Sequence, residues 1–131
     1  MTSSLTTCDN PTLLSPLGLA FMGDTVYDLL AREALLLEAN RPTQQLHKAA
    51  AAVVNAKAQA ARAKELLPLF TEEEAAVFRR GKNAKPGHVP QTCSREEYAL
   101  ATGLEALFGW LWLKGNFERA RKLFFIKEDS P

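Results

Sequence analysis

Apolar residues recur at three- and four-residue spacing along most of this 131-residue chain, which is the spacing of one face of an α-helix. The pattern is strongest over residues 15–39, where Leu17, Phe21 and Leu36 lie on the apolar stripe and Pro42 follows its end. No segment of four or more residues alternates cleanly between apolar and polar positions. The pattern therefore predicts an all-α fold without β-strands.

Start and stop signals predict further helices after the first. Their ranges are about 43–67, 71–80, 95–114 and 117–126. Two capping boxes mark helix starts, Thr71 with Glu74 and Ser94 with Glu97. In a capping box the two side chains satisfy main-chain N–H groups of the first helical turn. We expect one domain over residues 1–131, with ordered helices from about 15 to 126 and no internal repeat or linker.

Two glycines, Gly18 and Gly23, interrupt the first predicted helix. A glycine inside a helix is less favourable than alanine by about 1 kcal/mol, so its presence needs a reason. We expect another main chain or a ligand to pack closely against this part of the helix.

Charge is distributed unevenly along the chain, although its formal net value is only +1. Residues 41–95 hold ten lysines and arginines against four glutamates, a balance of +6, and the rest of the chain has a balance of −5. Two interpretations stay open. Either the middle of the chain docks a polyanion, or these charges are ordinary solvated helix faces.

The interval from Gly81 to Cys93 is the one long irregular segment, and loops of this length are usually functional or mobile. It contains no acidic residue and follows two arginines. The candidates for contacts with phosphate oxygens and ribose hydroxyls are Arg79, Arg80, Lys82, Asn83 and Lys85. Lys57 in the second predicted helix offers another basic contact. The alternative is a surface loop without a binding role.

Three carboxylates stand out because they lie within apolar helices. Asp24 and Asp28 are about one turn apart in AFMGDTVYDLL, and Glu105 lies within ALATGLEALFGWLWL. Embedded carboxylates need compensation, either from a bound cation or from paired arginine or lysine. Carboxylates with water and substrate phosphate are typical Mg²⁺ ligands, and such a site hydrolyses phosphodiesters. The metal site and the structural ion pair stay open as alternatives.

Other kinds of site find little support in the sequence. Cys8 and Cys93 form no CxxC, and His47 and His88 form no HExxH, so a zinc site is not expected. The chain also has no P-loop, GxGxxG or GxSxG motif. Because the longest apolar stretch, residues 104–113, is too short to span a bilayer and the N-terminus has no secretory pattern, we expect a cytoplasmic protein without membrane contact.

Four segments, in the right order, resemble the ribonuclease III family. LGLAFMGDTVYDLL is similar to the family signature, in which a Gly-Asp pair follows an apolar stretch, and ATGLEALFGWLWL is similar to its second acidic helix. LHKAAAAVVNAKAQA and FRRGKNAKPG resemble the small branch of the family, Mini-ribonuclease III. The resemblance runs from Leu17 to Leu113.

This resemblance implies an all-helical endonuclease domain that cleaves double-stranded RNA with Mg²⁺ and acts as a homodimer. Asp24 matches the signature aspartate and Glu105 the essential glutamate, so both are implied to be catalytic and to bind the metal. Asp28 is a supporting candidate ligand. Phe21, three residues before Asp24, matches the aromatic residue that packs across the family's dimer interface.

Two positions differ from full-length ribonuclease III. Ala20 and Thr102 stand where those enzymes carry further acids, which is similar to Mini-ribonuclease III and favours one metal ion per subunit. We also expect no double-stranded RNA-binding domain. The catalytic domain and its basic loop would then supply all affinity for RNA.

The resulting hypothesis is an Mg²⁺-dependent endoribonuclease that leaves 5′-phosphate ends and matures the precursor of the large-subunit (23S) ribosomal RNA. A ribosomal protein is a further candidate partner. One alternative is a non-catalytic dimeric RNA-binding or ribosome-assembly factor, which the presence of both Asp24 and Glu105 disfavours. Another is a helical protein-interaction module without RNA, which leaves the charge segregation unexplained.

Overall fold

The computed structural model describes residues 10–85 and 87–127. They form six α-helices and two short 3₁₀ turns, with no β-strand among them, so the all-α prediction is confirmed. The helices are α2 (Pro16–Glu38), α3 (Thr43–Val54), α4 (Ala56–Leu66), α5 (Glu72–Lys82), α6 (Arg95–Leu113) and α7 (Phe117–Phe125). The 3₁₀ turns are η2 (Pro11–Leu13) and η3 (Leu67–Leu69).

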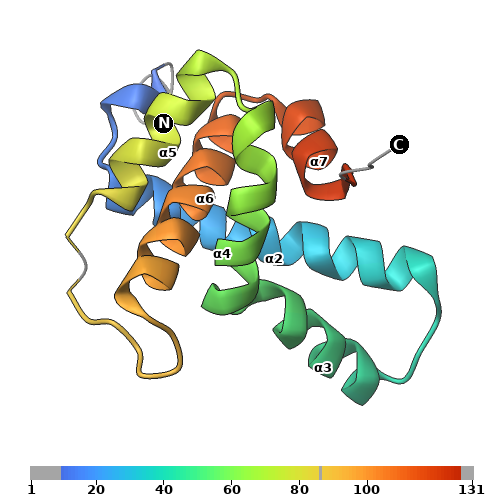
Figure 1. Ribbon diagram of the computed structural model, residues 1–131. Coiled ribbons are helices and arrows are strands. Elements are labelled where there is room, and N and C mark those ends of the chain that lie inside the picture. Colours follow the sequence, from blue (N-terminus) through green and yellow to red (C-terminus); the bar gives the residue numbers. More distant parts are fainter. Residues whose placement is uncertain (1–9, 86, 128–131) are drawn as a thin grey trace, which may run out of the picture.

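Helix α6 lies at the centre of the fold, with α2, α4, α5 and α7 around it (Figure 1). Leu104, Leu107 and Phe108 of α6 are fully buried, together with Leu19 and Leu30 of α2. Burying such side chains is the main favourable contribution to folding. The central position of α6 explains why its sequence is apolar on all sides.

Both predicted capping boxes are present. The Thr71 hydroxyl accepts a hydrogen bond from the Glu74 main-chain N–H at 3.1 Å. The Ser94 hydroxyl accepts one from the Glu97 N–H at 3.0 Å. Each glutamate side chain accepts in return from the N–H of its capping partner, so α5 and α6 begin within a residue of where the sequence predicts.

The main chains of α2 and α6 touch where the two helices cross. A Cβ added to Gly23 would lie 1.6 Å from the main-chain oxygen of Glu105, and one added to Gly109 would lie 2.0 Å from that of Leu19. The predicted close packing is therefore confirmed at Gly23. It is wrong at Gly18, which is exposed in the first turn of α2 and faces only the Ser15 hydroxyl.

Gly81 has a packing role in place of the predicted terminating one. The sequence predicts that it ends its helix, but α5 continues to Lys82. A Cβ on Gly81 would lie 2.7 Å from the Ala106 side chain and 3.0 Å from Gly103 Cα, so glycine here lets α5 approach α6 closely. Lys82, which the sequence assigns to the loop, consequently belongs to the last helical turn together with Arg79.

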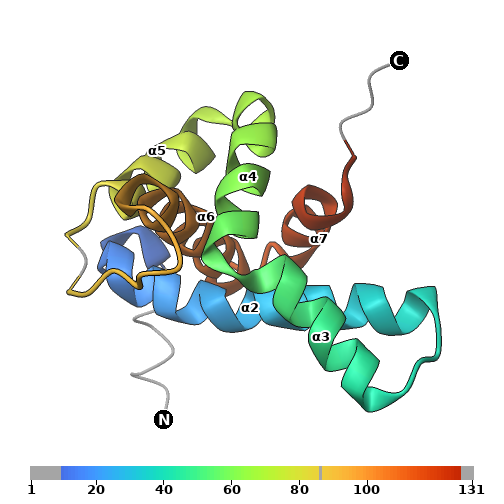
Figure 2. The same ribbon diagram turned by 60° about the horizontal axis from the view of Figure 1, so that its bottom comes forward.

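A single asparagine divides the helix predicted over 43–67 into two. Asn55 has extended main-chain angles, with φ −73° and ψ 160°. Its side chain accepts from the Ala58 N–H at 2.9 Å and donates to the carbonyls of Ala51 and Ala52, so it caps α4 and α3 together. The break lets α3 lie along the C-terminal half of α2, while α4 packs on α6 (Figure 2).

Three arginines tie the helices together. Arg119 makes a two-pronged bond to the buried Glu74 at 2.7 and 2.8 Å. The other two donate to main-chain carbonyls: Arg62 to three at the C-terminal end of α7, and Arg80 to those of Thr12 and Leu14. Arg62 and Arg80 therefore stabilise the packing of α7 and of η2 against the other helices, in addition to any contact with a ligand.

None of the helices within residues 10–85 and 87–127 combines the length and the apolar character needed to cross a membrane.

The crossing of α2 and α6 predicts the effect of one added methyl group. We expect Gly23→Ala to lower the free energy of unfolding by about 1 to 3 kcal/mol or more, because the new Cβ meets main chain that cannot rotate away. Gly18→Ala, one turn earlier in α2, is the control and should leave stability unchanged or raise it. Urea denaturation of both variants measures this, and equal stability of the two would contradict the account.

Candidate active site

The crossing of α2 and α6 brings Asp24 and Glu105 to one hollow. Asp24 follows Gly23 in α2, and the main-chain oxygen of Glu105 faces Gly23. The hollow has a volume of about 390 Å³. Besides the two acids it is lined by Leu17, Ala20, Phe21, Gly87, Tyr98 and Thr102. The structure thus joins the two candidate acids, although they are far apart in the sequence.

The two carboxylates differ in their surroundings. The sequence predicts that both are embedded, but Asp24 is exposed, and only Glu105 is partly buried. Burial raises the pKa of Glu105 most, the charge of Asp24 and hydrogen bonding with it raise it further, and the Gln59 amide lowers it, so that the pKa of Glu105 is about 8. Without a cation, Glu105 therefore keeps its proton at neutral pH.

No cationic side chain neutralises this pair among the described residues. The ion pairs there join other acids to arginines, and neither Asp24 nor Glu105 takes part in one. The structural ion pair that the sequence left open is thus not formed. Two neighbouring acids without a basic partner are favourable once a cation binds between them.

Asp28 does not join the pair. Its carboxylate accepts a hydrogen bond from Arg32 Nε at 3.1 Å, one turn further along α2. Within the part of the chain that the structure describes, no three His, Cys, Asp or Glu side chains form a metal-binding group. The acidic side chains that line the hollow are therefore those of Asp24 and Glu105, and these are the candidate metal ligands.

These two carboxylates fit a single Mg²⁺ ion. Mg²⁺ is usually held by one or two carboxylates, with water and substrate phosphates completing its coordination. The raised pKa of Glu105 fits the same role, because a cation would favour the ionised form that burial and Asp24 disfavour.

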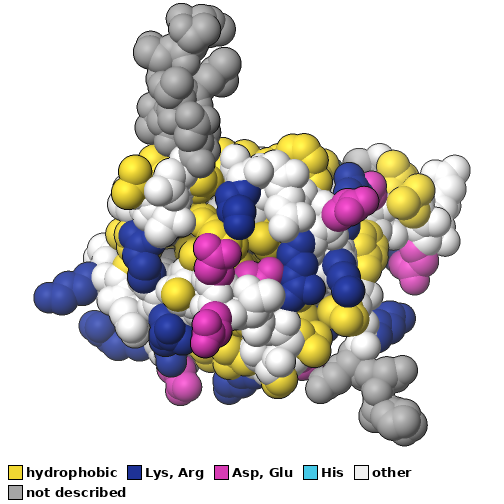
Figure 3. Space-filling model, turned by 90° about the horizontal axis from the view of Figure 1, so that it is seen from above, with side chains coloured by type: hydrophobic (Ala, Val, Ile, Leu, Met, Phe, Trp, Pro, Cys, Tyr) yellow, Lys and Arg dark blue, Asp and Glu magenta, His cyan; other side chains and the backbone are white. Residues whose placement is uncertain are grey.

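The predicted RNA-binding residues lie on α4, on the last turn of α5 and in the segment after it. Lys57, Arg79, Lys82, Asn83 and Lys85 are exposed. Arg80 is exposed too but donates to η2 and the residue after it. The segment between α5 and α6 projects beside the start of α6, and its Gly87 lines the hollow (Figure 1). The face in Figure 3 carries acids among its lysines and arginines, so it presents no uniformly basic surface.

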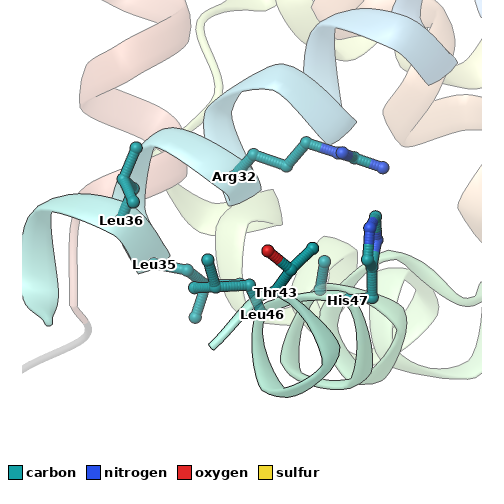
Figure 4. A pocket seen from close by; sticks show the side chains of 7 residues that line it. Arg32, Leu35, Leu36, Thr43, Leu46 and His47 are labelled. Atoms are coloured by element: carbon teal, nitrogen blue, oxygen red, sulfur yellow. The ribbon is translucent and has the colours of Figure 1, made fainter. Parts of the chain in front are cut away.

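A second hollow lies between α2 and α3 and is about 260 Å³ in volume. Leu35, Leu36 and Leu46 line it, and the side chains of Arg32 and His47 reach in from opposite helices (Figure 4). Its lining holds no carboxylate, so it offers neither the charge nor the ligands of the first hollow.

Comparison with known proteins identifies the family. The family model of the Ribonuclease III domain matches residues 17–116. The chain is 46% identical to the Mini-ribonuclease 3 of Symbiobacterium thermophilum, over 92% of each chain, and 44% identical to that of Thermoanaerobacter sp., over 84% of this chain and 78% of the relative.

The chain belongs to the Mini-ribonuclease 3 branch of the ribonuclease III family. A crystal structure of a Fusobacterium nucleatum protein is similar to it, with a TM-score of 0.77 and 34% identity over 86% of this chain and 89% of that one. A chain of this family is an endoribonuclease, and the hollow with Asp24 and Glu105 lies within the matched residues.

Two residues near the acids are not predicted from the sequence. Tyr98 lines the hollow one turn before Thr102, and the Gln59 amide acts on Glu105 from α4. The signal for Gln59 is visible in the helical spacing, which places it on the same stripe as Ala60, Ala63 and Leu66. A long polar side chain on an otherwise small and apolar stripe marks a special position.

The raised pKa of Glu105 predicts how stability depends on pH without metal. The folded protein holds this proton up to about pH 8, whereas the unfolded chain releases it near the ordinary pKa of about 4.3, so the free energy of unfolding falls as pH rises between these values. We expect Glu105→Gln to melt above wild type in EDTA, with a gap that widens from about pH 5 to about pH 8. The exposed Glu96→Gln is the control, and a gap that does not change with pH would contradict the assignment.

Proposed function

We propose that Asp24 and Glu105 bind Mg²⁺ and that this site hydrolyses double-stranded RNA. The observation that carries the proposal is the pairing of two carboxylates at one hollow, one of them partly buried and neither with a basic partner among the described residues. Gly87, which lines the hollow, belongs to the segment that follows the exposed Lys82 and Lys85. Membership of the ribonuclease III family supports the reaction.

Each residue has a distinct part in this mechanism. When bound, Mg²⁺ would activate a water molecule and neutralise the scissile phosphate. Glu105 is fixed by the main-chain contact of its helix with Gly23 and must lose its proton to act as a ligand. Asp24, being exposed, meets the solvent-facing side of the site. Because Ala20 and Thr102 add no carboxylate, the ligand set suits one ion per subunit. The resemblance to the ribonuclease III family further implies products with 5′-phosphate and 3′-hydroxyl ends.

For the physiological substrate we propose the precursor of the large-subunit (23S) ribosomal RNA, processed in the cytoplasm. The resemblance of the four motifs to Mini-ribonuclease III is what supports this choice. A ribosomal protein bound to that RNA is the candidate further partner.

The ligand assignment predicts separate effects on cleavage and binding. We expect Asp24→Asn and Glu105→Gln each to abolish cleavage of a long RNA duplex in Mg²⁺, while binding of the duplex is nearly unchanged, because metal-ligand charge is lost and phosphate contacts are not. Asp28→Asn is the matched control and should cleave normally, since Asp28 pairs with Arg32. Wild-type rates in either active-site variant would refute the proposal.

We further propose that two chains form a homodimer through the surface around Phe21. Phe21 is 82% exposed and Leu17 is 46% exposed, and both lie at the rim of the hollow. Such apolar side chains on one helix face favour association. A two-fold pair would set two sites against the two strands of one duplex.

Removing the aromatic ring tests this surface. Phe21→Ala should weaken dimerisation, because truncating a buried Phe typically costs about 3 to 5 kcal/mol. Leu13→Ala, exposed at η2, is the control and should leave association unchanged. Sedimentation of wild type at micromolar concentration should show a dimer, and finding only monomer would contradict the prediction.

For RNA binding we propose the exposed residues Arg79, Lys82, Asn83 and Lys85, with Lys57 and Arg80 as further basic contacts. Lysines and arginines hold RNA by its phosphates, while Asn83 can reach ribose hydroxyls in the shallow minor groove. Recognition would then depend mainly on the shape of the duplex.

Loss of phosphate contacts has a characteristic salt signature. Replacing Arg79, Lys82 and Lys85 together by Ala should raise KM for the duplex far more than it changes kcat, and should reduce the slope of log K against log salt by about one unit per lost contact. If affinity and slope stay as in wild type, the RNA follows Lys48 and Lys57 of α3 and α4 instead.

A further inference from the structure

Among residues 10–85 and 87–127, few polar side chains are buried, and one of these has a donor atom without a partner. Gln59, Glu74 and Thr102 are the buried polar residues of the described segments. Glu74 is bonded to Arg119, and the Thr102 hydroxyl donates to the Tyr98 carbonyl at 2.9 Å. Gln59 is only 2% exposed, and its Nε2 has no hydrogen-bond partner within that part of the chain. A buried donor without an acceptor is unfavourable, so its presence calls for a reason.

The surroundings of Gln59 exclude a solvent-facing role. It lies on the buried face of α4 with Ala60, Ala63 and Leu66, and this helix packs against α6. Its neighbours on this face include the short side chains of Ala60 and Ala63. An apolar residue of the same length would suit packing alone better than an amide does.

The group that Gln59 approaches on α6 is the carboxyl of Glu105. Burial and Asp24 raise the pKa of that carboxyl, and the Gln59 amide is the neighbour that opposes them by stabilising the ionised form. An amide does this by donating its N–H without bringing a charge. It can therefore orient a carboxylate without competing with a cation for it, which a lysine or arginine in the same place would do.

Ligating carboxylates in metal sites are commonly held by such outer hydrogen bonds. When one oxygen coordinates the ion, a donor on the other oxygen fixes the direction of the carboxylate. Gln59 lies on α4 and Asp24 lies on α2, so the two polar neighbours of Glu105 come from different helices.

We propose that Gln59 is a positioning residue, whose buried amide on α4 holds one oxygen of Glu105 so that the other is presented, together with Asp24, to the metal ion. This rests on the proposed function, in which Glu105 is a metal ligand. It adds a third helix to the site and gives the unpaired Nε2 its acceptor.

Metal binding by the full-length protein without RNA tests the proposal. Gln59→Met keeps the length of the side chain and removes both the N–H donor and the carbonyl acceptor of the amide. We expect it to weaken Mn²⁺ binding, measured by the EPR signal of free Mn²⁺, by about 10- to 100-fold. Its melting temperature in EDTA should equal or exceed that of wild type, because a buried unpaired donor is gone. Cleavage should recover as Mn²⁺ is raised, with KM for the duplex unchanged.

Controls separate the possible failures. Gln45→Met, exposed on α3, should bind Mn²⁺ like wild type. A folded Gln59→Met with wild-type Mn²⁺ affinity would overturn the positioning role alone, provided Glu105→Gln still abolishes Mn²⁺ binding. If Glu105→Gln binds Mn²⁺ like wild type, the proposed function fails and this proposal with it. Should Gln59→Met not fold, Gln59→Asn withdraws the same amide by one methylene, and the same loss of affinity is expected.

Discussion

The rest of the structure depends on the main-chain contact between α2 and α6. Glycine at positions 23 and 109 lets the two helices approach until a single added Cβ would overlap a carbonyl oxygen. The contact fixes the acids as well as the core, because Asp24 directly follows Gly23 and the carbonyl facing Gly23 belongs to Glu105. Side chains on two helices in main-chain contact have little freedom to separate. The geometry of the site is thus a consequence of how the core packs.

This arrangement has an electrostatic consequence that connects stability with function. Glu105 is held partly buried beside a second acid and without a basic residue, so ionising it is unfavourable in the metal-free protein. A site of this kind is less stable than an apolar or ion-paired core of the same shape, which is common for functional positions. Elsewhere the protein neutralises its buried charge, as the bond between Glu74 and Arg119 shows. Glu105 has no basic partner among the described residues, whereas Glu74 has one, and this difference distinguishes an acid of the candidate site from an acid that stabilises the fold.

How far the sequence predicts the molecule depends on the range of the interaction involved. Helix starts were predictable because capping boxes are local, and Gly23 because a glycine inside a helix is unfavourable unless another chain packs there. The break at Asn55 was missed because alanine-rich flanks favour an unbroken helix, while its side chain bonds in both directions. The exposure of Asp24 and the absence of Asp28 from the acidic pair depend on how α2 is rotated against α6, which spacing within one helix cannot reveal. Gln59 contacts a helix remote in sequence, so only the fold identifies its neighbour.

The central claim is that the contact of α2 with α6 creates one divalent-cation site from Asp24 and Glu105. Anomalous diffraction at the manganese edge, from crystals soaked in Mn²⁺, tests it most directly. The account predicts one anomalous peak per chain, within coordination distance of both carboxylates and absent from Asp24→Asn crystals. A peak beside Asp28 and Arg32, or no peak at saturating Mn²⁺, would contradict it.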